Sequence, residues 1–92
     1  MAERGFRARI SGRVQGVGYR YFAREKAGEL GITGYARNVP DGSVDVVAES
    51  EEQTLKEFLE LLREGPRLAR VTDIQVAWGP PSGEYDHFLL KP

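Results

Sequence analysis

The segment 11–20, Ser-Gly-Arg-Val-Gln-Gly-Val-Gly-Tyr-Arg, separates two hydrophobic patterns with different periods. Before it, apolar and polar residues alternate over 6–10, which is typical of a half-buried strand that ends at Gly12. After it, apolar residues recur at helical spacing over 19–30, and Gly31 stands where a helix usually ends. The segment is therefore predicted to be a loop that leads from a strand into a helix.

Three glycines, Gly12, Gly16 and Gly18, make this loop a candidate anion site. They could be ordinary turn residues, but glycine also adopts positive φ easily, so that successive N–H groups can turn toward one point. The helix N-terminus adds partial positive charge, and Arg20 brings a planar fork of five donors. Because an arginine at this place opposes the helix dipole, its position favours a role in binding a phosphate or a carboxylate.

Two further strands are predicted to form a hairpin after the first helix. They cover 33–39 and 44–48, and Pro40-Asp41-Gly42 favours a turn between them. Asn38, the only asparagine of the chain, lies at the end of the first of these strands. Taken alone, it could be a turn residue that caps the hairpin or a member of a site.

A second helix is predicted to begin at Ser50, since Ser50 and Gln53 have the spacing of a capping box. It ends at Gly65-Pro66, and a strand over 71–78 and a short edge strand over 87–91 complete the chain. The side chains expected in the core of these elements are Leu55, Phe58, Leu59, Leu62, Ile74, Val76 and Trp78.

This β-α-β-β-α-β order predicts an α+β, ferredoxin-like two-layer sandwich over a single domain, 1–92. Its antiparallel sheet would have four main strands and a short C-terminal edge strand, with two helices on one face. The first two strands would run in the same direction on either side of the third, so that their carboxyl ends share one edge. Two strand spacings then place Gly12 about 10 Å from Asn38, close enough for both to serve one small ligand.

The charges of the chain are unevenly distributed. Residues 1–40 carry eight Lys and Arg against three Asp and Glu, whereas residues 41–92 carry five against eleven. A basic half suits an anionic substrate or nucleic acid, but it can also be no more than a solvated surface. RNA-binding sheets of this topology present aromatic residues on their central strands, and 44–48 has none, so we expect no nucleic-acid partner. Arg7 and Arg9 are expected to be solvated on the face opposite the core, and the alternative is that they steer anions.

The residue types exclude several chemistries. The chain has no cysteine and a single histidine, His87, which is expected on the surface, so a cysteine nucleophile is excluded and a zinc site is not expected. No Gly-Lys-Ser/Thr follows the loop, and Tyr21 occupies the third glycine position of a dinucleotide fingerprint. What remains is an anion site without a nucleophile or a titrating acid or base. Such a site suits a bond with a good leaving group, for example a carboxyl phosphate.

Two motifs resemble those of the acylphosphatase family. Residues 12–20 match its first motif, and Gly-Tyr-Ala-Arg-Asn over 34–38, followed by Gly42 and Val44, matches its second. The resemblance covers nearly the whole chain and departs from the common pattern at Tyr19, where Phe is usual, and Ser50, where Gly is frequent. It implies a metal-independent hydrolase that cleaves acyl phosphates to a carboxylate and inorganic phosphate without a cofactor. A regulatory or acyl-phosphate-processing domain of a larger enzyme is the alternative.

The resemblance also implies roles for individual residues. Arg20 would bind the phosphoryl group together with the loop, and Asn38 would orient the attacking water, whose proton passes to a phosphate oxygen of the substrate. The residues expected in the phosphate-binding segment are Gly12, Arg13, Val14, Gln15, Gly16, Val17, Gly18, Tyr19 and Arg20. From the residues alone, Arg13 and Gln15 have no assigned chemistry and could only shape or solvate the loop.

The expected partners are therefore a small acyl phosphate and, as product or inhibitor, inorganic phosphate or a sulfate-type anion. We expect a monomer. No membrane partner is expected either, because no apolar run approaches transmembrane length. The N-terminus lacks the apolar region of a signal peptide, and the absence of cysteine fits a reducing compartment, so a cytoplasmic location is expected.

Overall fold

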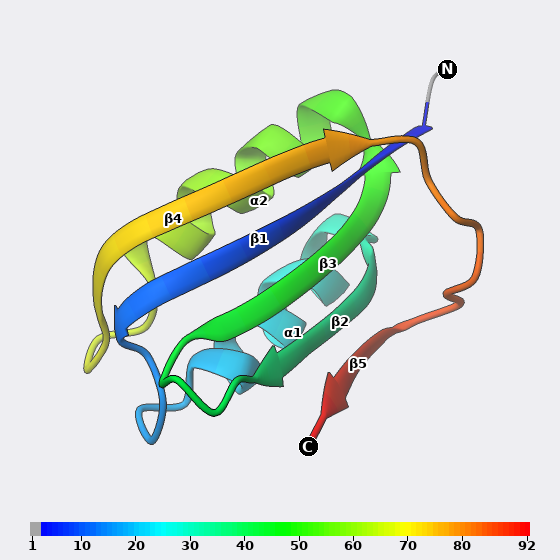
Figure 1. Ribbon diagram of the computed structural model, residues 1–92. Helices are drawn as coiled ribbons and strands as arrows, with labels where there is room; N and C mark the ends of the chain where they lie inside the picture. The colour runs from blue at the N-terminus through cyan, green and yellow to red at the C-terminus, as the bar shows by residue number, and fades with distance from the viewer. Residues whose placement is uncertain (1–2) are drawn as a thin grey trace.

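A computed structural model of the chain describes residues 3–92. Its elements follow the predicted β-α-β-β-α-β order, with a short fifth strand at the C-terminal end (Figure 1). They are β1 (Glu3–Arg13), α1 (Tyr19–Leu30), β2 (Thr33–Asn38), β3 (Val44–Glu51), α2 (Glu52–Glu64), β4 (Arg70–Gly79) and β5 (Phe88–Lys91).

The five strands form one sheet in the order β4-β1-β3-β2-β5. Strand β3 pairs antiparallel with both β1 and β2, and β5 adds a parallel edge strand beside β2. Both helices lie on one side of the sheet, so that its other face is open (Figure 1). This arrangement confirms the ferredoxin-like α+β fold, and it brings the carboxyl ends of β1 and β2 to one edge. No helix within residues 3–92 is long and apolar enough to cross a membrane.

The core lies between the helices and the sheet. Every second residue of β1 and β3 faces it, as strand geometry requires, and each helix contributes one apolar stripe. Phe58 of α2 is fully buried and packs against the rings of Phe6 and Phe88, which confirms its predicted place in the core. Burying a side chain of this size stabilises the fold by roughly 1.5–3 kcal/mol.

The predicted capping box at Ser50 is wrong. Ser50 pairs with Arg4 in the β1–β3 ladder, so its backbone belongs to β3 and α2 begins two residues later. Glu51 is the N-cap residue in extended conformation, and its side chain makes no capping hydrogen bond. Pairing with β1 extends β3 further than its hydrophobic pattern indicates, which leaves Ser50 too early to cap the helix.

Trp78 is also more exposed than predicted, with 37% of its surface accessible. Its ring meets the edge of the Phe6 ring at 5.5 Å between centroids, and the guanidinium of Arg4 lies 5.4 Å from its centroid. Because β4 is the outer strand of the sheet, no further strand covers the ring from that side. His87 is exposed as predicted, directly before the edge strand β5.

Arg7 and Arg9 lie on the open face of the sheet, but they are not simply solvated. Both side chains contact Asp45 of β3, a carboxylate that is only 1% exposed. The expectation of free surface arginines is therefore corrected, because the register of β1 against β3 places a buried acid between them.

Candidate active site

The loop between β1 and α1 is shaped by glycines in positive φ. Gly12 has φ 121°, Gly16 has φ 74° and Gly18 has φ 80°. A Cβ atom at Gly12 would collide with the carbonyl oxygen of Arg70, where β1 shifts its register against β4. Gly18 is the N-cap residue of α1 in left-handed conformation. Glycine is therefore required both where the loop leaves the sheet and where it enters the helix.

The loop presents free backbone donors at the start of α1. Within the described part of the chain, no acceptor is found for the N–H groups of residues 15–18, and the first turn of α1 contains no acidic residue. The helix dipole adds partial positive charge at the same point. Free N–H groups at a helix N-terminus form a site that favours an anion.

Arg20 lies in the first turn of α1 and is half-buried. Its Nη1 atom donates a hydrogen bond to the carbonyl oxygen of Lys91 at 2.8 Å. The last residue of β5 thus holds the guanidinium group on one side and leaves its other N–H groups for a ligand. The sequence carried no signal for this contact, because the two residues lie 71 positions apart.

Gln15 connects the glycine loop to the β2–β3 turn. Its Nε2 atom donates to the carbonyl oxygens of Val39 at 2.7 Å and Ser43 at 2.9 Å. Asn38 directly precedes this turn at the end of β2, and none of the hydrogen bonds found within residues 3–92 involves its side-chain amide. The loop and Asn38 therefore meet at the same edge of the sheet, where Figure 1 shows the β1–α1 loop next to the β2–β3 turn.

An open groove of about 520 Å³ follows this edge. It is lined by Gln15, Arg37, Asn38, Val39, Pro40 and Pro92. The guanidinium of Arg20 does not line the groove itself, but its hydrogen bond to Lys91 fixes it beside Pro92. The groove is wide and shallow, which suits a small ligand held at one end and exposed to water at the other.

Four other residues of the predicted segment have different surroundings. Val14 and Tyr19 are buried in the core, and the Tyr19 hydroxyl donates to the carbonyl oxygen of Leu62 at 2.5 Å. Only their backbone could contact a ligand. Burial raises the pKa of Tyr19, so its phenol stays protonated. Val17 packs partly against the core, and Arg13 is exposed.

No group at this edge is set up as a general acid or base. Asp41 lies in the adjacent turn, and its carboxylate accepts hydrogen bonds from the hydroxyl and the N–H group of Ser43 at 2.6 and 2.9 Å. These bonds lower the pKa of Asp41, so that it stays ionised near neutral pH. Among residues 3–92, no cluster of His, Cys, Asp or Glu has the geometry of a metal site.

Comparison with known proteins identifies similar chains along the whole fold. A family model described as acylphosphatase matches residues 6–90. An acylphosphatase of Thermus thermophilus is 58% identical over 76 residues, covering 83% of this chain and 86% of that protein. The crystal structure of an acylphosphatase from Bacillus subtilis has a TM-score of 0.93 at 34% identity, covering 97% and 99% of the two chains.

The same fold also matches part of a larger protein. The crystal structure of full-length HypF in its phosphate- and nucleotide-bound form has a TM-score of 0.89 at 27% identity. The match covers 98% of this chain but 12% of that one. A domain of this kind thus occurs both in chains of similar length and within a much longer one.

Proposed function

The chain belongs to the acylphosphatase family and hydrolyses acyl phosphates, and on this basis we propose roles for the residues at the edge described above. The loop 12–18 and Arg20 bind the phosphoryl group, and Asn38 positions the attacking water. The observation that supports these roles best is that the loop and Asn38 lie at one edge of the sheet, where neither the loop N–H groups nor the Asn38 amide has a hydrogen-bond partner within residues 3–92.

The phosphoryl oxygens are bound by the free N–H groups of residues 15–18 and by the guanidinium of Arg20. These donors are oriented before the substrate arrives, by the glycine conformations and by the bond from Arg20 to Lys91. In the transition state, charge increases on the phosphoryl group and the bonds strengthen. Removing one such oriented donor typically costs about 2.7–4 kcal/mol.

The amide of Asn38 offers an acceptor for a water proton and a donor for its oxygen. The water oxygen forms a bond to phosphorus while the bond from phosphorus to the acyl oxygen breaks. The acyl group leaves as a carboxylate, which needs no protonation because carboxylic acids have a pKa of about 4. The water proton passes to a phosphoryl oxygen, so the products are a carboxylate and inorganic phosphate.

Three substitutions test these roles, with benzoyl phosphate as substrate and inorganic phosphate as inhibitor. Arg20→Ala should lower kcat by roughly 10²–10³ and abolish inhibition by phosphate. Arg20→Lys should also be severely impaired, because it loses the two-pronged geometry. Asn38→Ala should lose turnover but keep its affinity for phosphate.

Arg24→Ala is the matched control, since Arg24 lies one turn further along α1 and is exposed. If Arg20→Ala keeps most of its activity, Arg20 is not part of the mechanism. If Asn38→Ala loses turnover and phosphate affinity together, Asn38 holds the loop rather than the water.

We also propose that residues 1–92 act as one autonomous domain, as a cytoplasmic monomer, without metal or nucleic acid. The match to 99% of the Bacillus subtilis chain supports a domain of this size, and the absence of cysteine fits a reducing compartment. Sedimentation of the purified chain, cell fractionation and an RNA gel shift test it, and a dimer, a membrane-bound fraction or an RNA complex would contradict it.

A further inference from the structure

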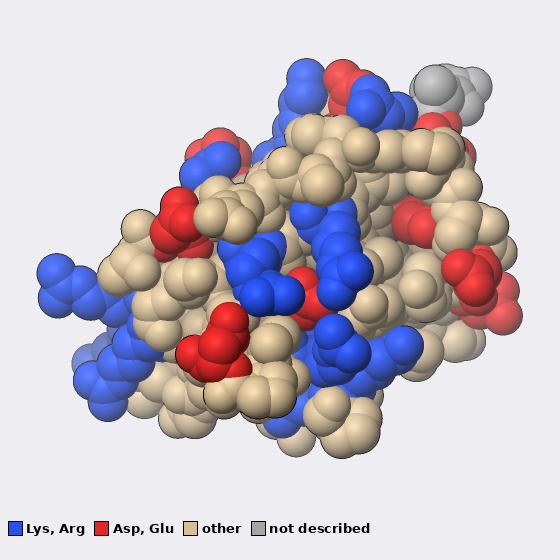
Figure 2. All heavy atoms as spheres, viewed as in Figure 1, with Lys and Arg blue, Asp and Glu red and all other residues tan. Residues whose placement is uncertain are grey.

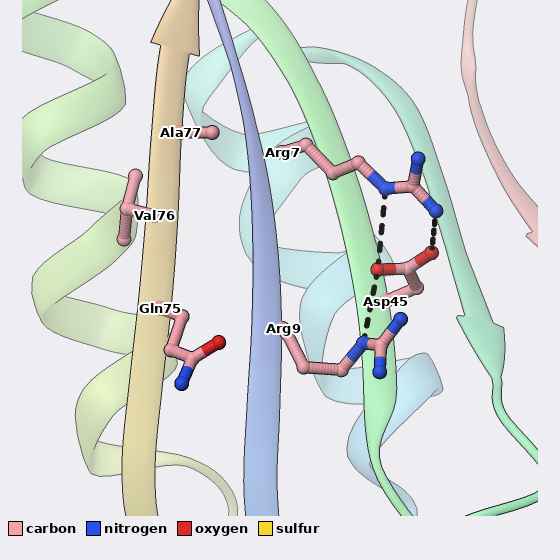
Figure 3. Close-up of a pocket in the computed structure, with 6 residues that line it drawn as sticks. All are labelled: Arg7, Arg9, Asp45, Gln75, Val76 and Ala77. Carbon is pink, nitrogen blue, oxygen red and sulfur yellow. Dashed lines mark hydrogen bonds and ion pairs between the residues drawn. The ribbon is translucent and has the colours of Figure 1, made fainter.

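The open face of the sheet carries a cluster of three arginines around one acid. Asp45 of β3 is 1% exposed, and its Oδ2 atom accepts hydrogen bonds from Arg7 at 2.6 Å and Arg37 at 3.1 Å. The Nε atom of Arg9 lies 3.5 Å from Oδ1. Figure 3 shows Arg7 and Arg9 reaching from β1 to this carboxylate, and Figure 2 shows basic atoms gathered around acidic ones on this face.

One carboxylate cannot neutralise three guanidinium groups. Arg9 has a second acidic neighbour, Asp41, but this contact is 3.4 Å long and exposed to water. Burial by itself would raise the pKa of Asp45, yet hydrogen bonds and positive charge from Arg7 and Arg9 outweigh it and hold the pKa below its ordinary value. Asp45 is therefore an anion that gathers the arginines, and the cluster keeps excess positive charge.

The arginines are oriented and still have free donors. Within residues 3–92, no hydrogen-bond partner is found for Arg7 Nη1, for Arg9 Nη2, or for Nε and Nη1 of Arg37. Since Asp45 already restrains the side chains, little further conformational entropy is lost when an anion binds. Arg7 and Arg9 lie two residues apart on β1, which separates their Cα atoms by about 6.8 Å.

A depression of about 350 Å³ lies beside the cluster. It is lined by Arg7, Arg9, Asp45, Gln75, Val76 and Ala77. Strand pairing places Ala77 opposite Arg7 and Gln75 opposite Arg9. The small side chain of Ala77 leaves space on β4, and the amide of Gln75 adds a donor at the other end.

We propose that this open-face site, formed by Arg7, Arg9, Arg37, Gln75 and Ala77, binds an oligophosphate group. A chain of two or three phosphates carries several negative charges and oxygen atoms on all sides. It can therefore accept hydrogen bonds from the free N–H groups of Arg7 and Arg9 at the same time, while Asp45 keeps its own contacts with both side chains. Arg37 of β2 also lines the groove at Asn38, but Arg7, Arg9, Gln75 and Ala77 do not. These four residues distinguish the site from that groove, because they lie on β1 and β4 on the face that the helices do not cover.

The test is an NMR titration of the full chain with inorganic tripolyphosphate. Backbone amide signals of residues 7, 9, 75 and 77 report the open-face site, while those of 16 and 18 report the loop. We expect the first group to shift and saturate with its own affinity. Arg7→Gln/Arg9→Gln should weaken that affinity at least about tenfold and leave the loop titration nearly unchanged.

Two further variants separate an effect of net charge from the need for the depression. Arg63→Gln/Arg67→Gln removes the same charge from exposed positions outside the open-face site, and should change the open-face affinity less than about threefold. Ala77→Leu keeps every charge but fills the depression from an exposed strand position, and should also weaken binding. The proposal is refuted if the open-face amides do not shift, if both double variants lose equal affinity, or if Ala77→Leu binds as well as the wild type.

A parallel titration with adenosine triphosphate in metal-free buffer separates the two sources of such a group. Equal or tighter binding of tripolyphosphate would identify the phosphate chain as the whole ligand. Tighter binding of the nucleotide would identify a nucleotide ligand, and either result supports the site.

Discussion

Gln15 provides the sharpest test of how the site is assembled, because its side chain joins the loop to the turn that follows Asn38. Gln15→Ala removes two hydrogen bonds, to Val39 at 2.7 Å and to Ser43 at 2.9 Å. Each neutral hydrogen bond contributes roughly 0.5–1.5 kcal/mol, and this side chain is half-buried, so water can replace part of the loss. We expect the free energy of unfolding to fall by about 1–2 kcal/mol.

Catalysis should respond differently from phosphate binding. The N–H groups of the loop are oriented by glycine conformations and by the start of α1, neither of which depends on Gln15. The distance between the loop and Asn38 does depend on it. A displacement of about 1 Å between reacting groups can cost up to 10² in rate, so kcat should fall about tenfold while phosphate inhibition changes less than threefold.

The assay compares turnover of benzoyl phosphate, inhibition by phosphate and urea unfolding for Gln15→Ala and Gln53→Ala. Gln53 is exposed on α2, so Gln53→Ala deletes the same side chain outside the site and serves as the control. If kcat and phosphate affinity fall together, Gln15 shapes the anion site itself. If stability falls but kcat does not, the link between loop and turn has no part in catalysis, and the reasoning is refuted.

Three other predictions follow from the geometry. Gly12→Ala should destabilise the fold by more than about 1 kcal/mol, because Gly12 has φ 121° and its Cβ would meet the carbonyl oxygen of Arg70. Gly28→Ala in α1 should instead stabilise the fold by up to about 1 kcal/mol. Urea unfolding of both variants measures these changes. The pKa of Asp45 is lowered in the folded state, so its contribution to folding stability is present above the unfolded pKa of about 3.9 and is lost as the pH falls through the folded value. Below pH 4 the wild type should therefore lose more stability than Asp45→Asn. Equal losses of stability in acid for the two proteins would contradict this. Activity should survive exhaustive chelation and vary little between about pH 5.5 and 7.5, since the proposed mechanism uses no general acid or base from the protein. A bell-shaped profile with a histidine-like limb would show that a titrating group is missing from the mechanism.

Local patterns in the sequence predicted the order of the elements and the glycine loop with Arg20, whereas the role of Asn38 came from the motif resemblance. The alternation in β1, the helical spacing from Tyr19 and the glycines of the loop each depend on near neighbours, so they can be read directly. The strand order then placed Gly12 and Asn38 at one edge, and the sheet confirms that order. The roles of Arg20 and Asn38 stay predictions that their variants can test.

The tertiary structure decided which residues support that site. Gln15 binds carbonyl groups more than 20 positions away, and Arg20 binds Lys91 across 71 positions. No local pattern marks these contacts, because a carbonyl acceptor is present in every residue type. They exist only because the sheet brings the loop, the β2–β3 turn and β5 to a common edge.

The register of the strands and their position in the sheet decided the surroundings of three further residues, Ser50, Trp78 and Asp45. Ser50 looks like a helix cap until pairing with Arg4 assigns it to β3, and Trp78 looks like core until β4 becomes the outer strand. Asp45 is buried although it lies on the open face, because arginines from both neighbouring strands cover it. The sequence by itself thus determined which segments are strands, helices and a glycine loop, since these follow from hydrophobic period and backbone freedom. Which distant groups meet depended on strand pairing, since pairing alone sets the neighbours of each side chain across the sheet.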